Sequence, residues 1–212
     1  MIADLAAVGP DYIPGHGHAD TFSFEFSLKG QRVFVNSGIS EYGLSSERLR
    51  QRKTAAHNTV TVNDLDSSVV WSGFRVAQRA RIKDRVVRKV GSAVCFSASH
   101  DGFKQQGVNC IHQRSWNLGT KEIKIIDELE GEFNSAIGNL HLHPSVVVES
   151  IDNDVVVLSA ADFMLQLKFS GASILLGDTS WHPEFGVSLP SRKLCCSFLG
   201  DSMSIEISWS KR

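Results

Sequence analysis

The sequence shows no excess of either charge and no long apolar run. Its 22 lysines and arginines stand against 23 aspartates and glutamates, a formal net charge of −1. Neutralising phosphates needs a concentrated positive excess, so this balance gives no support to nucleic-acid binding as the main activity. The chain lacks the ~18 consecutive apolar residues of a transmembrane helix, and its start lacks a basic segment followed by an apolar one. We therefore expect no membrane span and no signal peptide, and we interpret this start as the middle of a longer protein.

Cysteine is also scarce and carries no metal or redox pattern. The four cysteines are Cys95, Cys110, Cys195 and Cys196, and none forms a C-x-x-C pair. That spacing excludes a zinc ribbon or a redox pair by pattern. We interpret them as small buried thiols.

The dominant signal is an alternation of apolar and polar residues, which is typical of strands that cover a core on one side. It predicts strands over 21–28, 32–36, 58–63, 122–127, 145–149, 155–158, 163–170 and 203–209. Turn residues just before 155–158 indicate a hairpin. Helical periodicity is weak, and only 45–55 could form a short helix. We expect 1–212 to be a single all-β domain, an antiparallel β-sandwich (supersandwich-like) of many short strands with little helix.

The densest cluster of chemically capable residues is Gly15-His16-Gly17-His18-Ala19-Asp20, just before the first predicted strand. His16 and His18 are two apart, so in an extended chain both imidazoles point to the same side. Such a pair can bind a metal, or one histidine can bind a metal while the other transfers a proton. The flanking glycines allow close approach of the backbone. An HxH pair alone also fits a solvated polar turn; the motifs that follow favour the functional interpretation.

Two further motifs follow this HxH motif. Residues 33–38 read Val-Phe-Val-Asn-Ser-Gly, an apolar strand that ends in a polar turn, and residues 54–60 read Thr-Ala-Ala-His-Asn-Thr-Val. In the second, His57 enters another strand. Tyr42 and a basic group lie between the two motifs. The members of the basic group are Arg48, Arg50, Arg52 and Lys53, and by default such a group is a solvated face.

The order of these motifs carries a resemblance. GHGHAD with an alternating strand, then Asn-Ser-Gly with a nearby tyrosine, then AHNTV, resembles the heparinase II/III family of bacterial polysaccharide lyases. The resemblance is to the β-sandwich that lies C-terminal to an α/α-toroid in those enzymes, and it is most specific over 14–63. It implies β-elimination at a uronic acid. A base removes the proton α to the carboxylate, an acid protonates the leaving oxygen, and the carboxylate charge is neutralised.

The resemblance also implies roles for individual residues. His16 would lie at the catalytic cleft and assist substrate binding or proton transfer, while His18 and His57 would be zinc ligands. The third zinc ligand in the family is an aspartate, and this chain has Asn36 there. Because asparagine offers only a neutral oxygen, zinc affinity should be weaker, and a metal-free site held by hydrogen bonds is the alternative. Asp20 is close in sequence to His18 and could substitute as the anionic ligand.

The family's main catalytic tyrosine and asparagine belong to the toroid, which this chain lacks, so the chain resembles half of an active site. Tyr42 could act from the sandwich side, with a packing role as the alternative. The resemblance implies an acidic polysaccharide as substrate and an α/α-toroid domain as partner in the full-length protein. We expect the isolated chain to be inactive. Family members are typically periplasmic or bound to the cell envelope, and we expect that location for the full-length protein.

A second basic stripe comes from the residues alone. Four basic residues alternate with others over 79–85, so a strand there would carry one basic face. Such a face could hold an acidic polysaccharide or dock against an acidic toroid surface. The alternative is a solvated edge strand whose charges prevent aggregation. Arg79 and Arg81, with Arg52 from the earlier group, are our candidates for binding substrate.

Two other interpretations remain open. One is a non-catalytic carbohydrate-binding or structural sandwich that keeps the motifs for packing, which the departure at Asn36 favours. The other is a cupin-like metal enzyme, because HxH near a strand also opens that barrel's metal motif. The cupin motif needs a glutamate three or four residues after the second histidine. Thr21, Phe22 and Ser23 occupy that region and Glu25 lies too far along.

Overall fold

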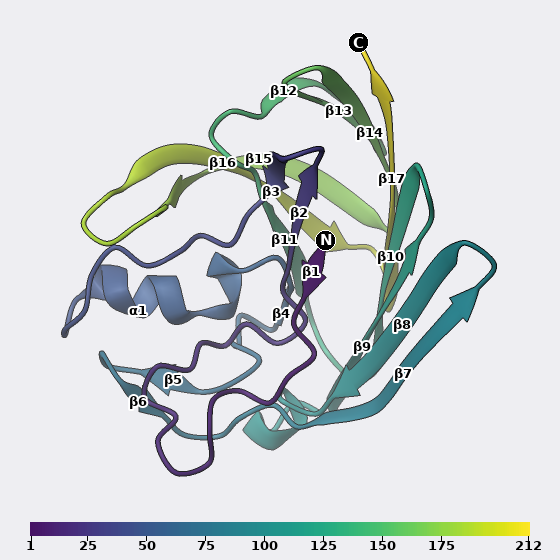
Figure 1. Ribbon diagram of the computed structural model, residues 1–212. Helices are drawn as coiled ribbons and strands as arrows, with labels where there is room; N and C mark the ends of the chain where they lie inside the picture. Colours follow the sequence, from purple (N-terminus) through teal and green to yellow (C-terminus); the bar gives the residue numbers. More distant parts are fainter.

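A computed structural model describes all residues from 1 to 212, and it consists of two layers of antiparallel strands (Figure 1). The larger layer is one sheet of eight strands. In spatial order these are β12 (Val147–Asp152), β13 (Val155–Ala160), β14 (Phe163–Ser170), β17 (Ser202–Lys211), β10 (Glu122–Gly131), β9 (Cys110–Leu118), β8 (Ala93–His100) and β7 (Ile82–Val90).

The second layer is made of two smaller sheets. One contains β1 (Ile2–Ala3), β2 (Phe24–Leu28) and β3 (Gln31–Phe34), and the other contains β15 (Ala172–Trp181), β16 (Leu189–Phe198), β11 (Ala136–His141) and β4 (Val60–Val62). A bridge between Phe34 and Leu142 links them. The structure therefore confirms the all-β antiparallel sandwich.

The core lies between these two layers, and the alternation of the strands produces it. In β14 the side chains of Leu165, Leu167 and Phe169 are buried, whereas Gln166 and Lys168 between them are exposed. β17 repeats this pattern beside it. The main cluster of 24 buried residues joins both layers, and a smaller cluster of six lies around Val60, Phe103 and Leu129, so burial of apolar side chains between the layers stabilises the sandwich.

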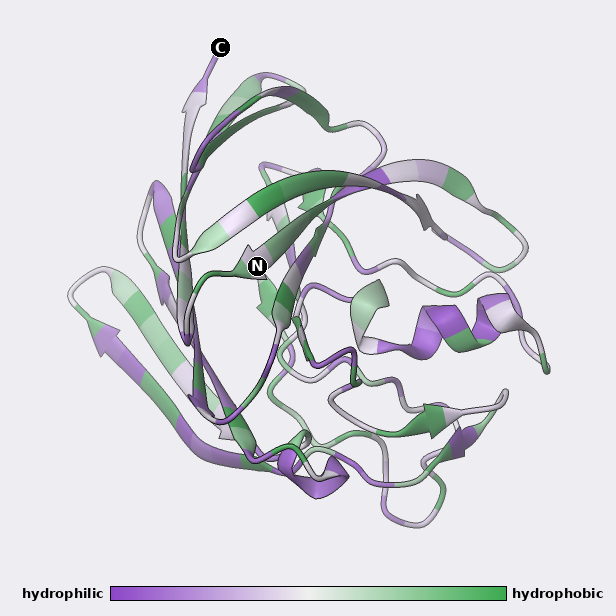
Figure 2. Ribbon diagram, turned by 180° about the vertical axis from the view of Figure 1, so that it is seen from behind, coloured by the Kyte–Doolittle hydropathy of each residue, from purple (hydrophilic) through white to green (hydrophobic).

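The few helices and the hairpin of β5 (Val70–Trp71) and β6 (Arg75–Val76) lie beside the sandwich (Figure 1). α1 spans Ser46–Arg52 and is followed by the short helices η1 (Thr54–Ala56) and, further on, η2 (Lys104–Gln106). Ser45 caps α1, since its hydroxyl accepts a hydrogen bond from the Arg48 amide at 2.9 Å. α1 is among the most hydrophilic segments in Figure 2. No helix of the chain combines the length and apolarity needed to span a membrane.

One predicted strand is wrong. β7 begins only at Ile82, so Arg79 and Arg81 precede it. Asp84 then adopts a positive φ of 52°, and the register shifts between Lys83 and Val86. Such a bulge breaks the alternation of faces. The basic residues of 79–85 therefore do not share one face.

A network of buried charged groups crosses the inner face of the large sheet. Asp127 of β10 accepts hydrogen bonds from Arg114 Nε at 2.6 Å and Nη2 at 2.9 Å, and His112 Nε2 lies 2.6 Å from the same carboxylate. His100 Nε2 lies 3.1 Å from His112 Nδ1, and the Gly102 amide donates to His100 Nδ1. This chain of bonds leaves His100 and His112 neutral. The charge of Arg114 and the His112 contact lower the pKa of Asp127 to about 2, against its burial.

Arg114 also ties the second layer to the first. Its Nη1 donates to the carbonyl oxygens of Phe22 at 2.9 Å and Asn58 at 2.6 Å. Phe22 has a φ of 67°, which is unfavourable for a bulky residue, and its side chain is fully buried. The bond to Arg114 holds this bend just before β2. Asn58 follows His57, so the same guanidinium fixes the chain on both sides of the site described below.

Breaking this buried pair should destabilise the fold strongly. We expect Asp127→Asn to lower the free energy of unfolding by about 3–5 kcal/mol, because Arg114 keeps a buried charge without a carboxylate. Urea unfolding measures the change. Glu128→Gln is the control, since Glu128 is the next residue on the strand and is exposed; it should shift stability by less than about 0.5 kcal/mol. A similar small loss in both variants would contradict this role for Asp127.

Buried histidines should make stability depend on pH. Burial lowers the pKa of His100 and His112, and lowers that of His141 to about 3. Below the ordinary pKa of about 6.5, the unfolded chain takes up protons that the folded chain does not. The free energy of unfolding should therefore fall from pH 7 to pH 5, by about 2 kcal/mol for each histidine that stays neutral.

Urea unfolding at the two pH values tests this expectation. His141→Gln should give a shallower dependence on pH than the wild type, whereas His143→Gln, at a more exposed position, should change the slope less. Equal stability of the wild type at pH 7 and pH 5 would contradict the expectation.

Candidate functional site

The three motifs meet where α1 lies beside the second layer. The HxH loop, the turn after β3 and the segment after η1 bring together His18, Asn36 and His57. The rings of His18 and His57 are 5.3 Å apart between centroids, and His57 Nδ1 lies 2.9 Å from Asn36 Oδ1. The structure therefore brings together the three residues that the resemblance grouped.

The turn after Asn36 depends on a glycine. Gly38 has a φ of 78°, and a Cβ there would lie 2.1 Å from the carbonyl oxygen of His182. Only glycine accommodates this approach. The Asn-Ser-Gly motif thereby packs against the end of β15 and directs Asn36 toward His57.

Asn58 holds the next segment by three side-chain bonds. Its amide nitrogen donates to the carbonyl oxygens of Phe24 at 2.7 Å and Val35 at 3.1 Å, and its Oδ1 accepts from the His141 amide at 2.6 Å. β2, the end of β3 and β11 are thus joined at one buried side chain. Because His57 immediately precedes Asn58, this clamp sets where the imidazole lies.

Arg52 is placed inside the protein and supports the HxH loop. Its guanidinium donates to the carbonyl oxygens of Gly17, Trp71, Ser72 and Arg75, with the Nη2 bond to Gly17 at 2.9 Å. These five bonds use every N–H of the group. Arg52 is fully buried, so it has no donor left for a substrate, and the solvated face expected for the basic group is wrong for this residue.

Arg48 lies four residues earlier and therefore on the same face of α1. It is also fully buried, which again contradicts a solvated face. Its Nη1 lies 3.3 Å from His18 Nε2. Burial and the charges of Arg48 and Arg52 lower the pKa of His18 to about 4, so His18 is neutral and its Nε2 accepts the bond.

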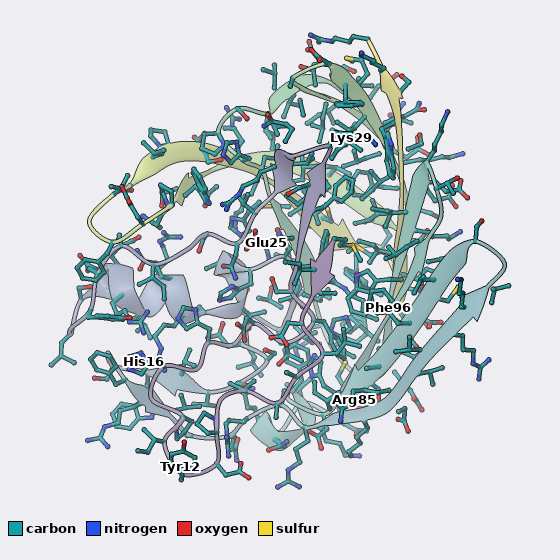
Figure 3. The ribbon with its side chains drawn as sticks, viewed as in Figure 1. Tyr12, His16, Glu25, Lys29, Arg85 and Phe96 are labelled. Carbon is teal, nitrogen blue, oxygen red and sulfur yellow. The ribbon has the colours of Figure 1, made fainter.

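His16 is exposed, whereas His18 is half-buried. It lies on the N-terminal loop next to α1 (Figure 3). Its ring makes edge contacts with Tyr42 at 5.7 Å and Phe74 at 5.5 Å between centroids. Tyr42 is exposed and also contacts Phe185. The two residues that the sequence nominated for proton transfer are thus neighbours at the surface.

Two adjoining hollows border the HxH loop. His16, His18 and Asp20 line one of about 260 Å³. Arg79 and Arg81 line another of about 570 Å³, and the two share Ala7 and Val8. The guanidinium of Arg79 is bound to the N-terminal loop between the two hollows. It donates to the Val8 carbonyl at 3.0 Å and to the Asp11 carboxylate at 2.6 Å.

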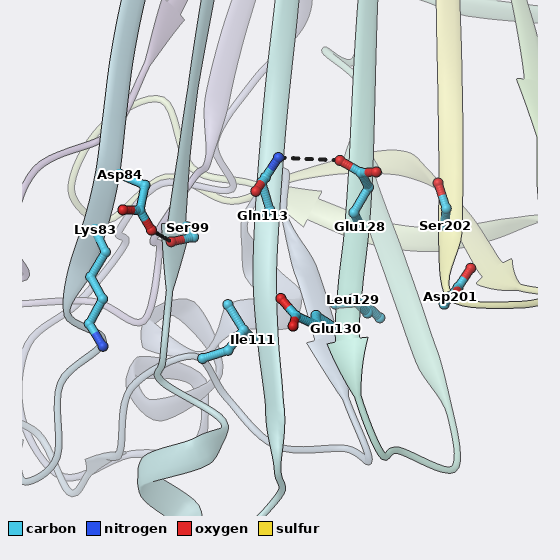
Figure 4. A pocket seen from close by; sticks show the side chains of 10 residues that line it. All are labelled: Lys83, Asp84, Ser99, Ile111, Gln113, Glu128, Leu129, Glu130, Asp201 and Ser202. Atoms are coloured by element: carbon cyan, nitrogen blue, oxygen red, sulfur yellow. Dashed lines mark hydrogen bonds between the residues drawn. The ribbon is translucent and has the colours of Figure 1, made fainter.

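A hollow on the outer face of the eight-stranded sheet is lined mainly by acidic side chains (Figure 4). Its volume is about 560 Å³, and its charged side chains are those of Lys83, Asp84, Glu128, Glu130 and Asp201. Four carboxylates against one lysine would repel an acidic polymer. This face is therefore unsuited to the ligand that the sequence predicts.

The residues expected to hold zinc offer the ion no negative charge. Two imidazoles and a neutral amide supply no negative charge, and no three His, Cys, Asp or Glu side chains come together as a metal-binding group. Asp20 does not complete the set, and burial with the nearby charge of Asp4 raises its pKa to about 7. The lone pair of His18 faces the Arg48 cation. Zinc binding stays a prediction from the resemblance, and these contacts favour the metal-free alternative.

These features define a β-sandwich domain with a histidine cluster at one side of it. The chain matches the family described as Heparinase II/III-like, C-terminal, over residues 1–210. It belongs to that family. Among curated proteins, none matches the chain significantly.

Solved structures share the fold. A mutant of the heparan sulfate lyase HepC from Pedobacter heparinus is 16% identical with a TM-score of 0.77, and the match covers 99% of this chain and 32% of that chain. The Heparinase III-BT4657 gene product is 17% identical with a TM-score of 0.74, over 93% of this chain and 31% of that chain. This chain thus spans about a third of the length of these proteins.

Sequence reasoning missed Arg48 and Asn58. The signal for Arg48 was its spacing of four from Arg52, which puts both on one helix face and Arg50 on another. Arg50 indeed bonds to Ser180 of β15 at 2.8 Å. Asn58 gave no signal beyond its place beside His57, because its partners come from three distant strands.

Restoring the carboxylate should restore zinc affinity. We expect untagged wild-type protein to retain less than one zinc per chain, and Asn36→Asp to bind zinc roughly tenfold or more tightly, since an anion then faces the dication. Metal analysis after dialysis against zinc measures this. Asn134→Asp, at an exposed position, is the control for added charge. One zinc per wild-type chain, lost in His18→Ala and His57→Ala, would establish the zinc site despite Asn36.

Proposed function

We propose that this chain is the C-terminal domain of a polysaccharide lyase that cleaves uronate-containing acidic glycans by β-elimination. The carrying observation is the exposed pair of His16 and Tyr42 beside the His18, Asn36 and His57 cluster. The named activities of the similar structures support the proposal. An upstream α/α-toroid domain would complete the active site.

The chemistry of the pair suits β-elimination. An imidazole and a phenol can each exchange a proton near neutral pH when they are positioned at the reacting atoms. In this proposal, His16 and Tyr42 assist removal of the proton α to the carboxylate or protonation of the leaving oxygen. His18 is half-buried and His57 is buried. Both are neutral, and they hold the loop that carries His16.

Electrostatics around the site suit an acidic glycan. Arg81 is exposed on the hollow that adjoins the HxH loop, and we propose it as a contact for the polymer. Arg79 would act indirectly by holding the loop. On the other side of α1, Arg50, Lys53 and Lys193 line a hollow of about 420 Å³ with a single carboxylate, Asp178. A charged polysaccharide does not cross a membrane, which supports a periplasmic or cell-envelope location.

A second candidate function is a non-catalytic carbohydrate-binding or structural sandwich. The observation that favours it is that Asn36 Oδ1 is hydrogen-bonded to His57. In that case the motifs serve packing. Absence of lyase activity when this chain is joined to a toroid domain would favour this alternative.

Replacing His16 in the longer protein should reduce turnover far more than stability. We expect His16→Ala to lower kcat by about 10²–10⁴-fold, the usual contribution of a general acid or base. Formation of unsaturated uronate, followed by ultraviolet absorbance, measures this on acidic polysaccharides. His143→Ala is the control, since His143 contacts Trp181 elsewhere on the surface.

Two outcomes would contradict the proposal. Equal turnover of His16→Ala and wild type would remove His16 from the mechanism. Product formation by residues 1–212 alone would show that the chain is not half of an active site.

A further inference from the structure

Arg48 is a buried cation that uses only one of its three guanidinium nitrogens for a hydrogen bond. It is 0% exposed. Nη1 contacts His18 Nε2, but Nε and Nη2 have no hydrogen-bond partner in the protein. The other two fully buried arginines differ from it, because Arg52 and Arg114 donate from Nε, Nη1 and Nη2 alike.

The two free nitrogens lie on one edge of the guanidinium. Nε–H and Nη2–H point in parallel along that edge, at the spacing that matches two oxygens of one carboxylate or sulfate. The unused part of Arg48 is therefore the part that binds an oxyanion with two bonds.

No carboxylate of the protein bonds to this edge. Glu47 is bonded to Arg50 and Gln51, and Glu41 accepts from Ser45. Burying a charge is unfavourable unless its donors are paired. Burial accordingly lowers the pKa of Arg48. An anion from outside would relieve this penalty.

The cover over Arg48 consists of two aromatic rings. Its guanidinium carbon lies 5.2 Å from the ring centroid of Tyr42 and 5.8 Å from that of Phe74. These rings are 51% and 42% exposed, and each belongs to a connecting segment, before α1 and between β5 and β6. Rotation of either side chain would open a path to the guanidinium, and exposed aromatic rings offer a face for a sugar ring.

We propose that Arg48 binds the carboxylate or sulfate group of an acidic sugar through Nε and Nη2, with Tyr42 and Phe74 against the sugar. The acidic sugar as carrier of the anion rests on the proposed function; the anion site itself rests on the geometry of Arg48. The histidine cluster is then organised around a cationic side chain that faces an anionic ligand.

Binding of small anions to residues 1–212 tests this proposal. Calorimetric titration with glucuronate and with inorganic sulfate should show binding, and glucose at the same concentration should show none. Tighter binding of glucuronate would identify a carboxylate as the ligand group, and tighter binding of sulfate would identify a sulfated sugar. Failure of the folded wild-type chain to bind either anion overturns the proposal.

Three variants separate anion binding from structural support. Arg48→Met should weaken anion binding at least tenfold, and Arg48→Lys should fall between it and the wild type, because lysine keeps the charge without the fork. Lys121→Met, which removes an exposed cation between β9 and β10, should bind as the wild type does. Equal anion binding by wild type and Arg48→Met overturns the proposal.

Thermal unfolding supplies a second readout. Without added anion, Arg48→Met should have an equal or higher Tm than wild type, since it removes an unpaired buried charge. A merely structural Arg48 predicts a lower Tm, and a misfolded Arg48→Met would overturn the proposal unless folded Arg48→Lys still shows the weakened binding. If the longer protein cleaves no acidic polysaccharide while this chain still binds glucuronate through Arg48, only the lyase function fails.

Discussion

The guanidinium of Arg114 fixes the two chain segments that carry the histidine cluster. Asp127 compensates its charge inside the core, which leaves Nη1 free to bond the carbonyl oxygens of Phe22 and Asn58. One carbonyl lies after the HxH loop and the other beside His57. Because interactions in the interior are poorly screened and close-packed neighbours cannot shift freely, this pair fixes two loops relative to one sheet.

Three fully buried arginines show how the same side chain serves different ends. Arg114 and Arg52 each donate from all three guanidinium nitrogens to carboxylate or carbonyl oxygens, so both are structural. Arg114 orders the strands, and Arg52 orders the HxH loop. Arg48 bonds to His18 through Nη1, and its Nε and Nη2 have no partner in the protein. The difference lies in which acceptors the backbone supplies nearby, and it separates supporting residues from a ligand-binding one.

Asn36 changes the electrostatic character of the cluster. With an aspartate there, one negative charge would face two imidazoles and favour a dication. With Asn36, His18 and His57 are neutral and the Arg48 cation contacts His18. The arrangement is thereby better matched to an anionic ligand than to a metal ion.

The sequence by itself determined the sandwich class and eight of the seventeen strands, because alternation is local and repeats along the chain. The grouping of His18, Asn36 and His57 followed from the resemblance that the motif order carries. The sequence did not determine the break at Asp84 or the burial of Arg48 and Arg52. A bulge and a buried charge depend on which carbonyls and rings distant segments place nearby, as those of Trp71 and Phe74 are placed over α1. Only the packed structure decides such partners. From sequence alone a charged residue is expected at the surface, because burying it requires hydrogen-bond acceptors that only the fold can place around it.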